Sequence, residues 1–340
     1  MINWQTNSPL SEYTTFKVGG PADHLAVVKT SAELVEAVRQ AQKNNWPYLV
    51  LGKGSNTLVA DSGFRGAVII NGSQEIKILE GKGKEPEGIK LKPRFDALEK
   101  ETADLTGSGY DFKDYPPVWV QFDSGVTLPR AIFGLISEGI TGLEWFAGIP
   151  ATAGGASFIN LHGGNKYWSD FMVEAQILND KGELTAVPAS YFSYDYDDSK
   201  IKKTKDTVVT VTLKLYRGPK DEALTIAKTW SLKKSHQPQR SAGCIFQNLD
   251  AATQAKLKLP TPSIGYLMDQ VLNLKGKQIG QARIGEKHAA FIENLGSAKA
   301  DDIIQLIKLM KQTAKKKLDL DLKLEIVPVG FSKEEIKWLD

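Results

Sequence analysis

Two glycine-rich segments hold the residues best suited to binding chemistry. The first, GKGSNTLV, runs from Gly52 to Val59 and follows the apolar run Tyr48–Leu51. The second, GLEWFAGIPATAGGASFIN, runs from Gly142 to Asn160. Glycine lets backbone N–H groups turn inward and approach a ligand closely. The pair of segments therefore predicts one elongated ligand held at two points, with a pyrophosphate at the first and a flat ring at the second.

The cofactor-binding residues expected in the first segment are consecutive: Gly52, Lys53, Gly54, Ser55, Asn56 and Thr57. The side chains of Ser55 and Asn56 can add donors around phosphate oxygens. The dinucleotide fingerprint G-x-G-x-x-G is incomplete, because Thr57 stands where its third glycine belongs. An ordinary glycine turn after a strand is the alternative interpretation of this segment.

The second segment predicts a rigid surface with few side chains that can lie against a planar ring. The residues expected to bind the cofactor there are Gly148, Ile149, Pro150, Gly154, Gly155 and Ala156, together with Gly125 at the end of VWVQFDSG. A glycine-rich turn that packs two elements together is the alternative.

Cys244 and Glu325 are the candidate catalytic residues. Cys244 lies in SAGCIF, and an unperturbed thiol, with a pKa of ~8.5, is protonated at neutral pH and can give its proton up. Glu325 lies in LDLKLEIVPV, where strand alternation places its side chain on the face opposite to that of Leu324 and its apolar neighbours. The alternatives are a small buried cysteine and a solvated glutamate on an outer strand face.

Metal and hydrolase chemistry have no support in the sequence. The histidines His24, His162, His236 and His288 lie far apart, and no cluster of Cys, His and Asp has ligand spacing. No G-x-S-x-G nucleophile elbow is present. We expect no metal ion.

Hydrophobic periodicity predicts alternating strands and helices. A capping box formed by Thr30 and Glu33 begins a helix that ends near Asn44. Further helices are expected at 128–138, 223–233 and about 303–314, and strands at 25–28, 48–51, 68–70, around a turn at 180–182, at 206–216, after the loop at 235–244, and over 320–331. The strand at 206–216 shows the strongest period-2 alternation. Residues from Glu75 to about Pro117 are rich in Lys, Glu, Gly and Pro, which predicts a solvated hairpin or surface insertion.

Composition places the chain among globular proteins of more than one domain. It has 340 residues, of which 41% are hydrophobic and 24% charged, and a net charge of +3 from interspersed Lys and Glu. This balance predicts no nucleic-acid surface. No signal peptide and no apolar run long enough to span a membrane is visible, and the single cysteine fits a reducing compartment. We expect a cytoplasmic protein.

Several segments together resemble the UDP-N-acetylenolpyruvoylglucosamine reductases, flavoenzymes of bacterial cell-wall synthesis. The matching segments run in the family's order and cover nearly the whole chain apart from the charged insertion: YTTFKVGGPAD, LGKGSNTLVADSGFRGAVI, GLEWFAGIPATAGGASFIN, SAGCIFQN, LKGKQIGQARIGEKHAAFIEN and LEIVPVG. The short connection between Tyr216 and SAGCIF resembles the shorter of the family's two subtypes.

The resemblance implies an α+β chain with a PCMH-type FAD-binding fold in two subdomains, at residues 1–70 and 71–218, followed by an α+β substrate-binding domain at 219–340. It also implies FAD as cofactor and NADPH as reducing cosubstrate. The implied substrate is UDP-N-acetylglucosamine enolpyruvate, and the implied product is UDP-N-acetylmuramate, a peptidoglycan precursor.

Residue by residue, the resemblance puts Cys244 in the place of the family's proton-donating serine and Glu325 in the place of its glutamate beside the substrate carboxylate. One position departs from the family. Asp197 stands between Tyr196 and Ser199, where the family has an arginine. A carboxylate in place of a carboxylate-binding cation inverts the local field, so Lys200, Lys202 or an arginine from elsewhere must supply the charge, or turnover is weak.

Two alternatives follow from this departure and from the fold. The first is another flavin oxidase or dehydrogenase of the same fold with a different substrate. The second is an FAD- or UDP-sugar-binding protein with reduced or lost turnover, an interpretation that Asp197 favours.

Overall fold

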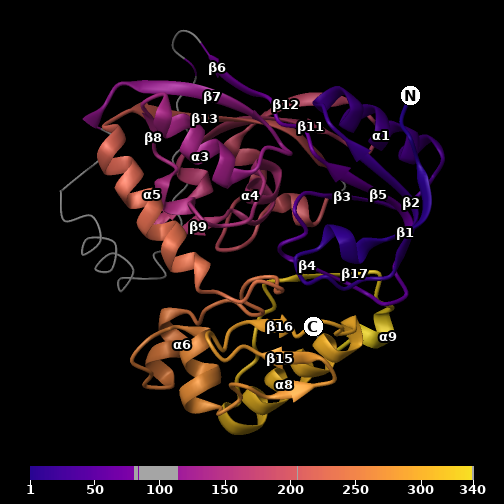
Figure 1. The fold of residues 1–340 in the computed structure, drawn as a ribbon, viewed down its shortest axis with the longest axis vertical. Helices are drawn as coiled ribbons and strands as arrows, with labels where there is room; N and C mark the ends of the chain where they lie inside the picture. The colour runs from indigo at the N-terminus through magenta and orange to yellow at the C-terminus, as the bar shows by residue number, and fades with distance from the viewer. Residues whose placement is uncertain (80–82, 84–113, 205, 339–340) are drawn as a thin grey trace. The chain divides into compact units, whose positions relative to one another are not determined.

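A computed structural model describes residues 1–79, 83, 114–204 and 206–338 of the chain (Figure 1). The chain divides into two compact units. Residues 1–3, 26–52 and 69–235 form the first unit, and residues 4–25, 53–68 and 236–340 form the second. This division does not test the three domains expected from the sequence, so their boundaries stay a prediction.

The first unit is built on a sheet with the strand order β12-β11-β13-β7-β6, in which β8 also pairs with β13. Its strands are β3 (Tyr48–Leu51), β6 (Ile76–Leu79), β7 (Pro117–Asp123), β8 (Ile140–Thr141), β9 (His162–Gly163), β10 (Lys166–Tyr167), β11 (Met172–Leu178), β12 (Leu184–Pro188) and β13 (Thr207–Arg217). Its helices are α1 (Ser31–Lys43), α3 (Leu128–Ser137), α4 (Ala153–Ile159) and α5 (Lys220–Ser235). Figure 1 shows α3, α4 and α5 gathered beside this sheet.

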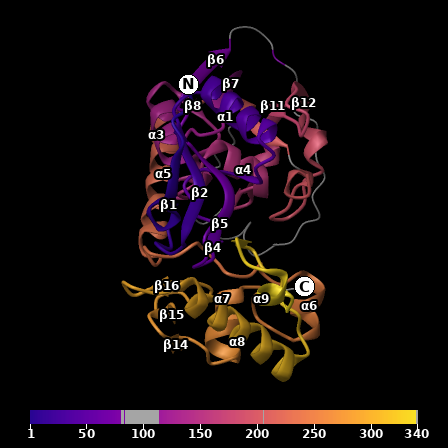
Figure 2. The same ribbon diagram turned by 90° about the vertical axis from the view of Figure 1, so that its right-hand side faces the viewer.

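The second unit contains a small antiparallel sheet, β14-β15-β16, and a parallel pair, β4 and β17. Its strands are β1 (Gln5–Pro9), β4 (Thr57–Val59), β14 (Gln278–Ile279), β15 (Ala282–Ile284), β16 (Ile292–Asn294) and β17 (Val327–Val329), and its helices are α6 (Ala251–Lys256), α7 (Ile264–Tyr266), α8 (Ala300–Leu318) and α9 (Lys333–Ile336). Helix α8 packs on β14 and β15 (Figure 2). Strands β2 (Pro21–Val28) and β5 (Phe64–Asn71), in the sheet order β1-β2-β5-β3, each begin in the second unit and end in the first.

Several helices and strands lie where short-range sequence patterns predict them. Helix α1 begins after Thr30, whose side chain accepts from the N–H of Glu33, while the Glu33 carboxylate accepts from the N–H of Lys29. Asn45 has a left-handed φ of 53°, which stops the helix. Strand β3 covers the predicted residues, and β11 and β12 pair antiparallel around the predicted turn. The predicted helices correspond to α3, α5 and α8.

The strand predicted at 206–216 is confirmed as β13, which is buried on both faces from Thr207 to Leu213, because α1 and α4 both contact it. Two other expectations about strands are corrected by the structure. The strand expected after residue 244 is reduced to one bridge, Phe246 with Leu324. The final strand is only β17, since Leu322 and Ile326 are buried without joining a ladder.

The ends of the predicted insertion belong to the sheet of the first unit. Strands β6 and β7 pair antiparallel, with Ile76 opposite Phe122 and Leu79 opposite Trp119. The remainder of the predicted insertion, residues 80–82 and 84–113, lies outside the described residues. No helix in the described part of the chain is both long enough and apolar enough to cross a bilayer.

Candidate functional site

The first glycine segment forms a loop between β3 and β4 in which two carbonyl groups are engaged by the protein. The Gly54 carbonyl accepts from the Thr15 N–H at 3.2 Å and the Asn56 carbonyl accepts from the Val327 N–H at 2.9 Å. The N–H groups of Lys53, Gly54 and Ser55 have no acceptor among the described residues. Successive amides of this kind form a concave donor site for an anion. This part of the chain therefore fits a phosphate-bearing cofactor.

Gly54 is required at the centre of this loop. Its φ is +59°, in the left-handed region that side chains disfavour. A Cβ built there would lie 2.3 Å from the backbone oxygen of Tyr13. The loop therefore rests directly on the backbone of residues 13–15, which fixes the direction of its amides.

The second glycine segment uses its amides differently. Thr152 caps α4, because its hydroxyl accepts from the Gly155 N–H at 3.2 Å. The N–H groups of Ala153 and Gly154 donate to the carbonyls of Val126 and Ser124 at 2.9 and 2.8 Å, and the Ala156 N–H donates to the Thr152 carbonyl. The N–H groups of residues 153–156 are therefore all hydrogen-bonded within the protein. The segment can therefore offer a ligand its surface, but not a set of backbone donors.

Several of its glycines are explained by close packing. A Cβ at Gly148, where φ is +82°, would lie 2.9 Å from the Cα of Ser231 on α5, and one at Gly154 would lie 2.8 Å from the Cβ of Ser124. Gly155 differs, because it is exposed and a Cβ built on it would lie 3.4 Å from its nearest neighbour, the Thr152 hydroxyl. Gly155 is the glycine of this segment whose surface has room for a ligand.

Two other predicted cofactor residues join the second segment within the first unit. A Cβ at Gly52 would lie 2.6 Å from the Thr152 hydroxyl. Gly125 sits against Asn71 and Ser73, with a built Cβ 2.6 Å from the Asn71 side-chain oxygen. The start of the first segment, the cap of α4 and Gly125 are thus brought close together, whereas Gly148 packs instead on α5.

The two candidate catalytic residues lie on neighbouring segments of the second unit. The Glu325 N–H donates to the carbonyl of Ile245, the residue after Cys244, at 2.9 Å. The side chains of Cys244 and Glu325 are both partly exposed. The Asn56 side chain donates to the Glu325 carbonyl at 3.2 Å. The amide loop, Cys244 and Glu325 therefore belong to one hydrogen-bonded assembly, although neither Cys244 nor Glu325 lies in a strand.

The backbone beside Cys244 is open. Gly243 has a φ of +79°, and apart from its chain neighbours no heavy atom of the described chain lies within 4 Å of a Cβ built on it. A ligand can therefore approach Gly243, the residue before Cys244, without displacing a side chain.

Comparison with known proteins places these features in one family. Residues 235–329 match the UDP-N-acetylenolpyruvoylglucosamine reductase C-terminal domain. The UDP-N-acetylenolpyruvoylglucosamine reductase of Chlamydia abortus is 30% identical over 322 residues, covering 94% of this chain and 93% of the relative. The reductase of Bacillus subtilis is 31% identical over 329 residues, covering 95% and 93%. The chain belongs to the UDP-N-acetylenolpyruvoylglucosamine reductase family.

The fold agrees with this membership. The crystal structure of UDP-N-acetylenolpyruvylglucosamine reductase (MurB) from Thermus caldophilus matches with a TM-score of 0.70 at 28% identity, covering 97% of this chain and all of that one. The α+β fold class expected from the sequence is confirmed, and so is the expectation of an oxidoreductase of this family. The roles of the individual site residues stay predictions.

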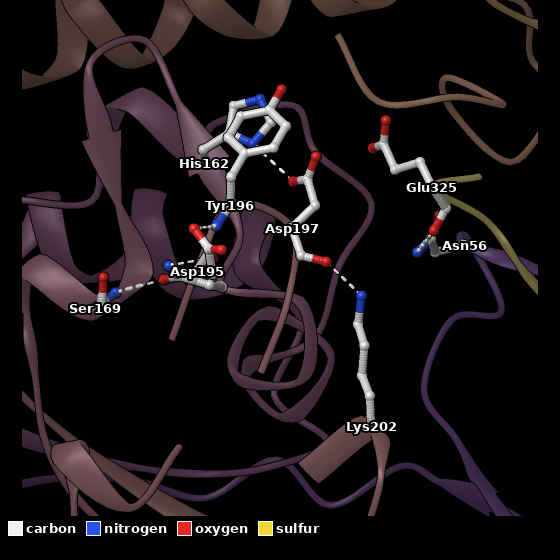
Figure 3. A network of polar contacts seen from close by, with 9 residues as sticks. Asn56, His162, Ser169, Asp195, Tyr196, Asp197, Lys202 and Glu325 are labelled. Carbon is white, nitrogen blue, oxygen red and sulfur yellow. Dashed lines mark hydrogen bonds and ion pairs between the residues drawn. The ribbon is translucent and has the colours of Figure 1, made fainter. Parts of the chain in front are cut away.

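Asp197, the departure from the pattern of the reductase family, lies in the first unit within a polar network (Figure 3). Its side chain is buried, and one carboxylate oxygen lies 3.0 Å from Nδ1 of His162. Lys202 donates from Nζ to the Asp197 backbone carbonyl. Sequence patterns offer no signal for this pair, because His162 lies 35 positions from Asp197.

Two tyrosines near this network keep their protons. Burial raises the pKa of the Tyr194 phenol well above its usual value. A hydrogen bond to Asp206 raises the pKa of the Tyr191 phenol, whose ring lies 3.9 Å from Nζ of Lys200. Neither phenol supplies charge beside Asp197.

Proposed function

We propose that this protein reduces UDP-N-acetylglucosamine enolpyruvate to UDP-N-acetylmuramate in the cytoplasm, as a step of peptidoglycan precursor synthesis. Membership in the family supports the reaction class. The observation that carries the proposal is the loop at residues 53–55, whose amides lack acceptors among the described residues and which is bonded through Asn56 to the segment bearing Glu325.

The residues present fit FAD. When bound, it would accept a hydride from NADPH and pass it to the terminal carbon of the enolpyruvyl group. The amides of Lys53, Gly54 and Ser55 would hold its pyrophosphate, because they have no acceptor among the described residues, while the Gly54 carbonyl is occupied by the Thr15 N–H. The exposed surface at Gly155, with Gly125 and the turn at Gly52, would face its ring.

Cys244 would complete the reaction with a proton. Hydride arrival at the terminal carbon leaves negative charge on the neighbouring carbon and the carboxylate, and a proton from Sγ would neutralise that carbon. Glu325, on the segment paired with that of Cys244, would lie beside the substrate carboxylate. Preorganised groups aimed at developing charge usually make the largest contribution to catalysis.

A two-step spectroscopic experiment tests the whole proposal. The purified protein should carry flavin absorption bands that NADPH bleaches without oxygen. UDP-N-acetylglucosamine enolpyruvate, added next, should restore the bands with one product formed per flavin, and UDP-N-acetylglucosamine should not. Oxygen consumption without a response to the enolpyruvyl compound would indicate another flavin oxidase. A yellow protein that NADPH does not bleach would indicate a binding protein without turnover.

Substitution of Cys244 separates the two half-reactions. Cys244→Ala should bleach with NADPH at the normal rate, yet reoxidise with the enolpyruvyl substrate about 100-fold or more slowly, since general acids contribute ~10²–10⁴-fold. Cys244→Ser keeps a hydroxyl proton in the same place and should recover part of the rate. Stopped-flow absorbance measures both steps, and reoxidation of the alanine variant at the normal rate would exclude a proton-donating role.

A further inference from the structure

His162 and Asp197 form a pair that the predicted site did not include. Figure 3 shows the Asp197 carboxylate directed at the imidazole ring of His162. Nδ1 of His162 lies 3.0 Å from one Asp197 oxygen. An ionised carboxylate can only accept, so the hydrogen of this contact belongs to Nδ1. Nε2 is therefore left as the ring nitrogen that can meet a ligand.

The buried position and backbone conformation of Asp197 cost free energy, and packing alone does not explain them. It is 2% exposed, and its second carboxylate oxygen is buried without a hydrogen-bond partner among the described residues. Its backbone has a φ of +49°, in the left-handed region. A buried carboxylate with an unsatisfied oxygen and a strained backbone is the kind of local conflict found at functional sites.

The nearby lysines are engaged elsewhere. Lys202 donates to the Asp197 backbone carbonyl and lies 3.7 Å from the Asp198 carboxylate. Lys200 lies over the Tyr191 ring. Within the described chain, the basic group that reaches the Asp197 carboxylate is therefore His162, rather than either lysine that the sequence offered.

The imidazole ring is fixed in orientation while remaining accessible. It stacks on Tyr196, with ring centroids 5.0 Å apart and planes at 28°, and a tilted contact joins it to Tyr167. The His162 side chain is 26% exposed, against 3% for that of Asp197. The buried carboxylate thus lies behind the ring, and a ligand that approaches from solvent meets the imidazole first.

We propose that His162, positioned by Asp197, binds the carboxylate of the enolpyruvyl group through Nε2–H. This inference rests on the proposed function. An imidazolium between two carboxylates is attracted to both, and the ring keeps the two anions apart. In this arrangement Asp197 stabilises the cation that binds the substrate, so the carboxylate in the arginine position does not exclude anion binding.

Binding to the oxidised, flavin-loaded protein tests the inference without turnover. Titration calorimetry would compare UDP-N-acetylglucosamine enolpyruvate with UDP-N-acetylglucosamine, which lacks the carboxylate. His162→Asn keeps an N–H near the position of Nδ1 for Asp197 and removes Nε2. It should weaken binding of the enolpyruvyl compound by about 10- to 100-fold, the contribution of a hydrogen bond to a charged group. Binding of UDP-N-acetylglucosamine should not change.

Asp197→Asn tests the positioning role. It should raise KM for the enolpyruvyl substrate by less than His162→Asn does, and leave the rate of flavin reduction by NADPH unchanged. If Asp197 had a merely structural role, the substitution would instead lower flavin occupancy and weaken the binding of both UDP compounds alike. His236→Asn, which removes an exposed imidazole of the other unit, is the matched control.

The outcomes distinguish this inference from the proposed function. If the wild-type protein prefers the enolpyruvyl compound and His162→Asn keeps that preference, the assignment of His162 is overturned and the proposed function stands. If the wild-type protein binds neither nucleotide, or binds both equally, the proposed function fails and this inference fails with it.

Discussion

The two glycine segments look alike in sequence, yet they expose different parts of the backbone. In the loop after β3, the carbonyls of Gly54 and Asn56 are engaged, and the amides of residues 53–55 have no acceptor among the described residues. In the segment leading into α4, the amides of residues 153–156 all bond to the protein. One segment therefore offers donors, and the other offers a surface.

The difference shows that glycine content does not by itself identify a ligand loop. At Gly54, Gly148 and Gly154 alike the missing side chain lets two protein segments approach each other. Gly54 and Gly148 also share a positive φ. What separates the two cases is the destination of each amide, and backbone groups must be satisfied somewhere.

The largest effect is expected at Gly54. Gly54→Ala would place a methyl group 2.3 Å from the Tyr13 backbone oxygen, in a conformation that costs a non-glycine residue about 1–2 kcal/mol before any clash. The backbone must move, so the amides lose their direction and the protein should be purified colourless and less stable. Flavin absorbance and thermal unfolding measure the two losses. Full flavin occupancy of the Gly54→Ala variant would mean that this loop does not bind the phosphates of the cofactor.

An intermediate effect is expected at Gly155, which probes the surface instead. Gly155→Ala leaves an ordinary contact with the Thr152 hydroxyl, so the melting temperature should hold or rise slightly. If the flavin ring lies against this position, the added methyl group should weaken flavin binding by about 1–3 kcal/mol, as overpacking does. Flavin titration of the apoprotein measures it. Unchanged affinity would exclude Gly155 from the ring contact and leave only the first segment as a cofactor loop.

The smallest effect is expected at Thr15, which hydrogen-bonds to the first loop at the Gly54 carbonyl. Its hydroxyl donates to the Ser241 carbonyl at 2.6 Å and lies 3.3 Å from the Gly54 carbonyl. Thr15→Val should lower the free energy of unfolding by about 1 kcal/mol, typical of one hydrogen bond, and weaken flavin binding by less than tenfold. Thr15→Ser keeps the hydroxyl and should match the wild type in denaturant unfolding. A valine variant as colourless as Gly54→Ala would mean that the side chain of Thr15 is as necessary to the loop as the glycine is, which would contradict this order of effects.

The sequence predicted the elements whose signals are local. Thr30 and Glu33 are three residues apart and act on each other, so the start of α1 could be read directly from the chain. The turn between β11 and β12 is equally local. The strand expected after Cys244 was wrong, because a ladder depends on a partner far along the chain, and here the two segments form only the single bridge between Phe246 and Leu324.

The candidate site shows the same division. Residue type and spacing determined the glycine loop at 52–57, the thiol of Cys244 and the carboxylate of Glu325 as separate pieces. Tertiary structure alone decided that Asn56 bonds to the Glu325 backbone, 269 positions away, and that His162 meets Asp197. The physical reason is that a side chain's chemistry belongs to its type, whereas hydrogen-bond partners and burial depend on which distant segments fold against it.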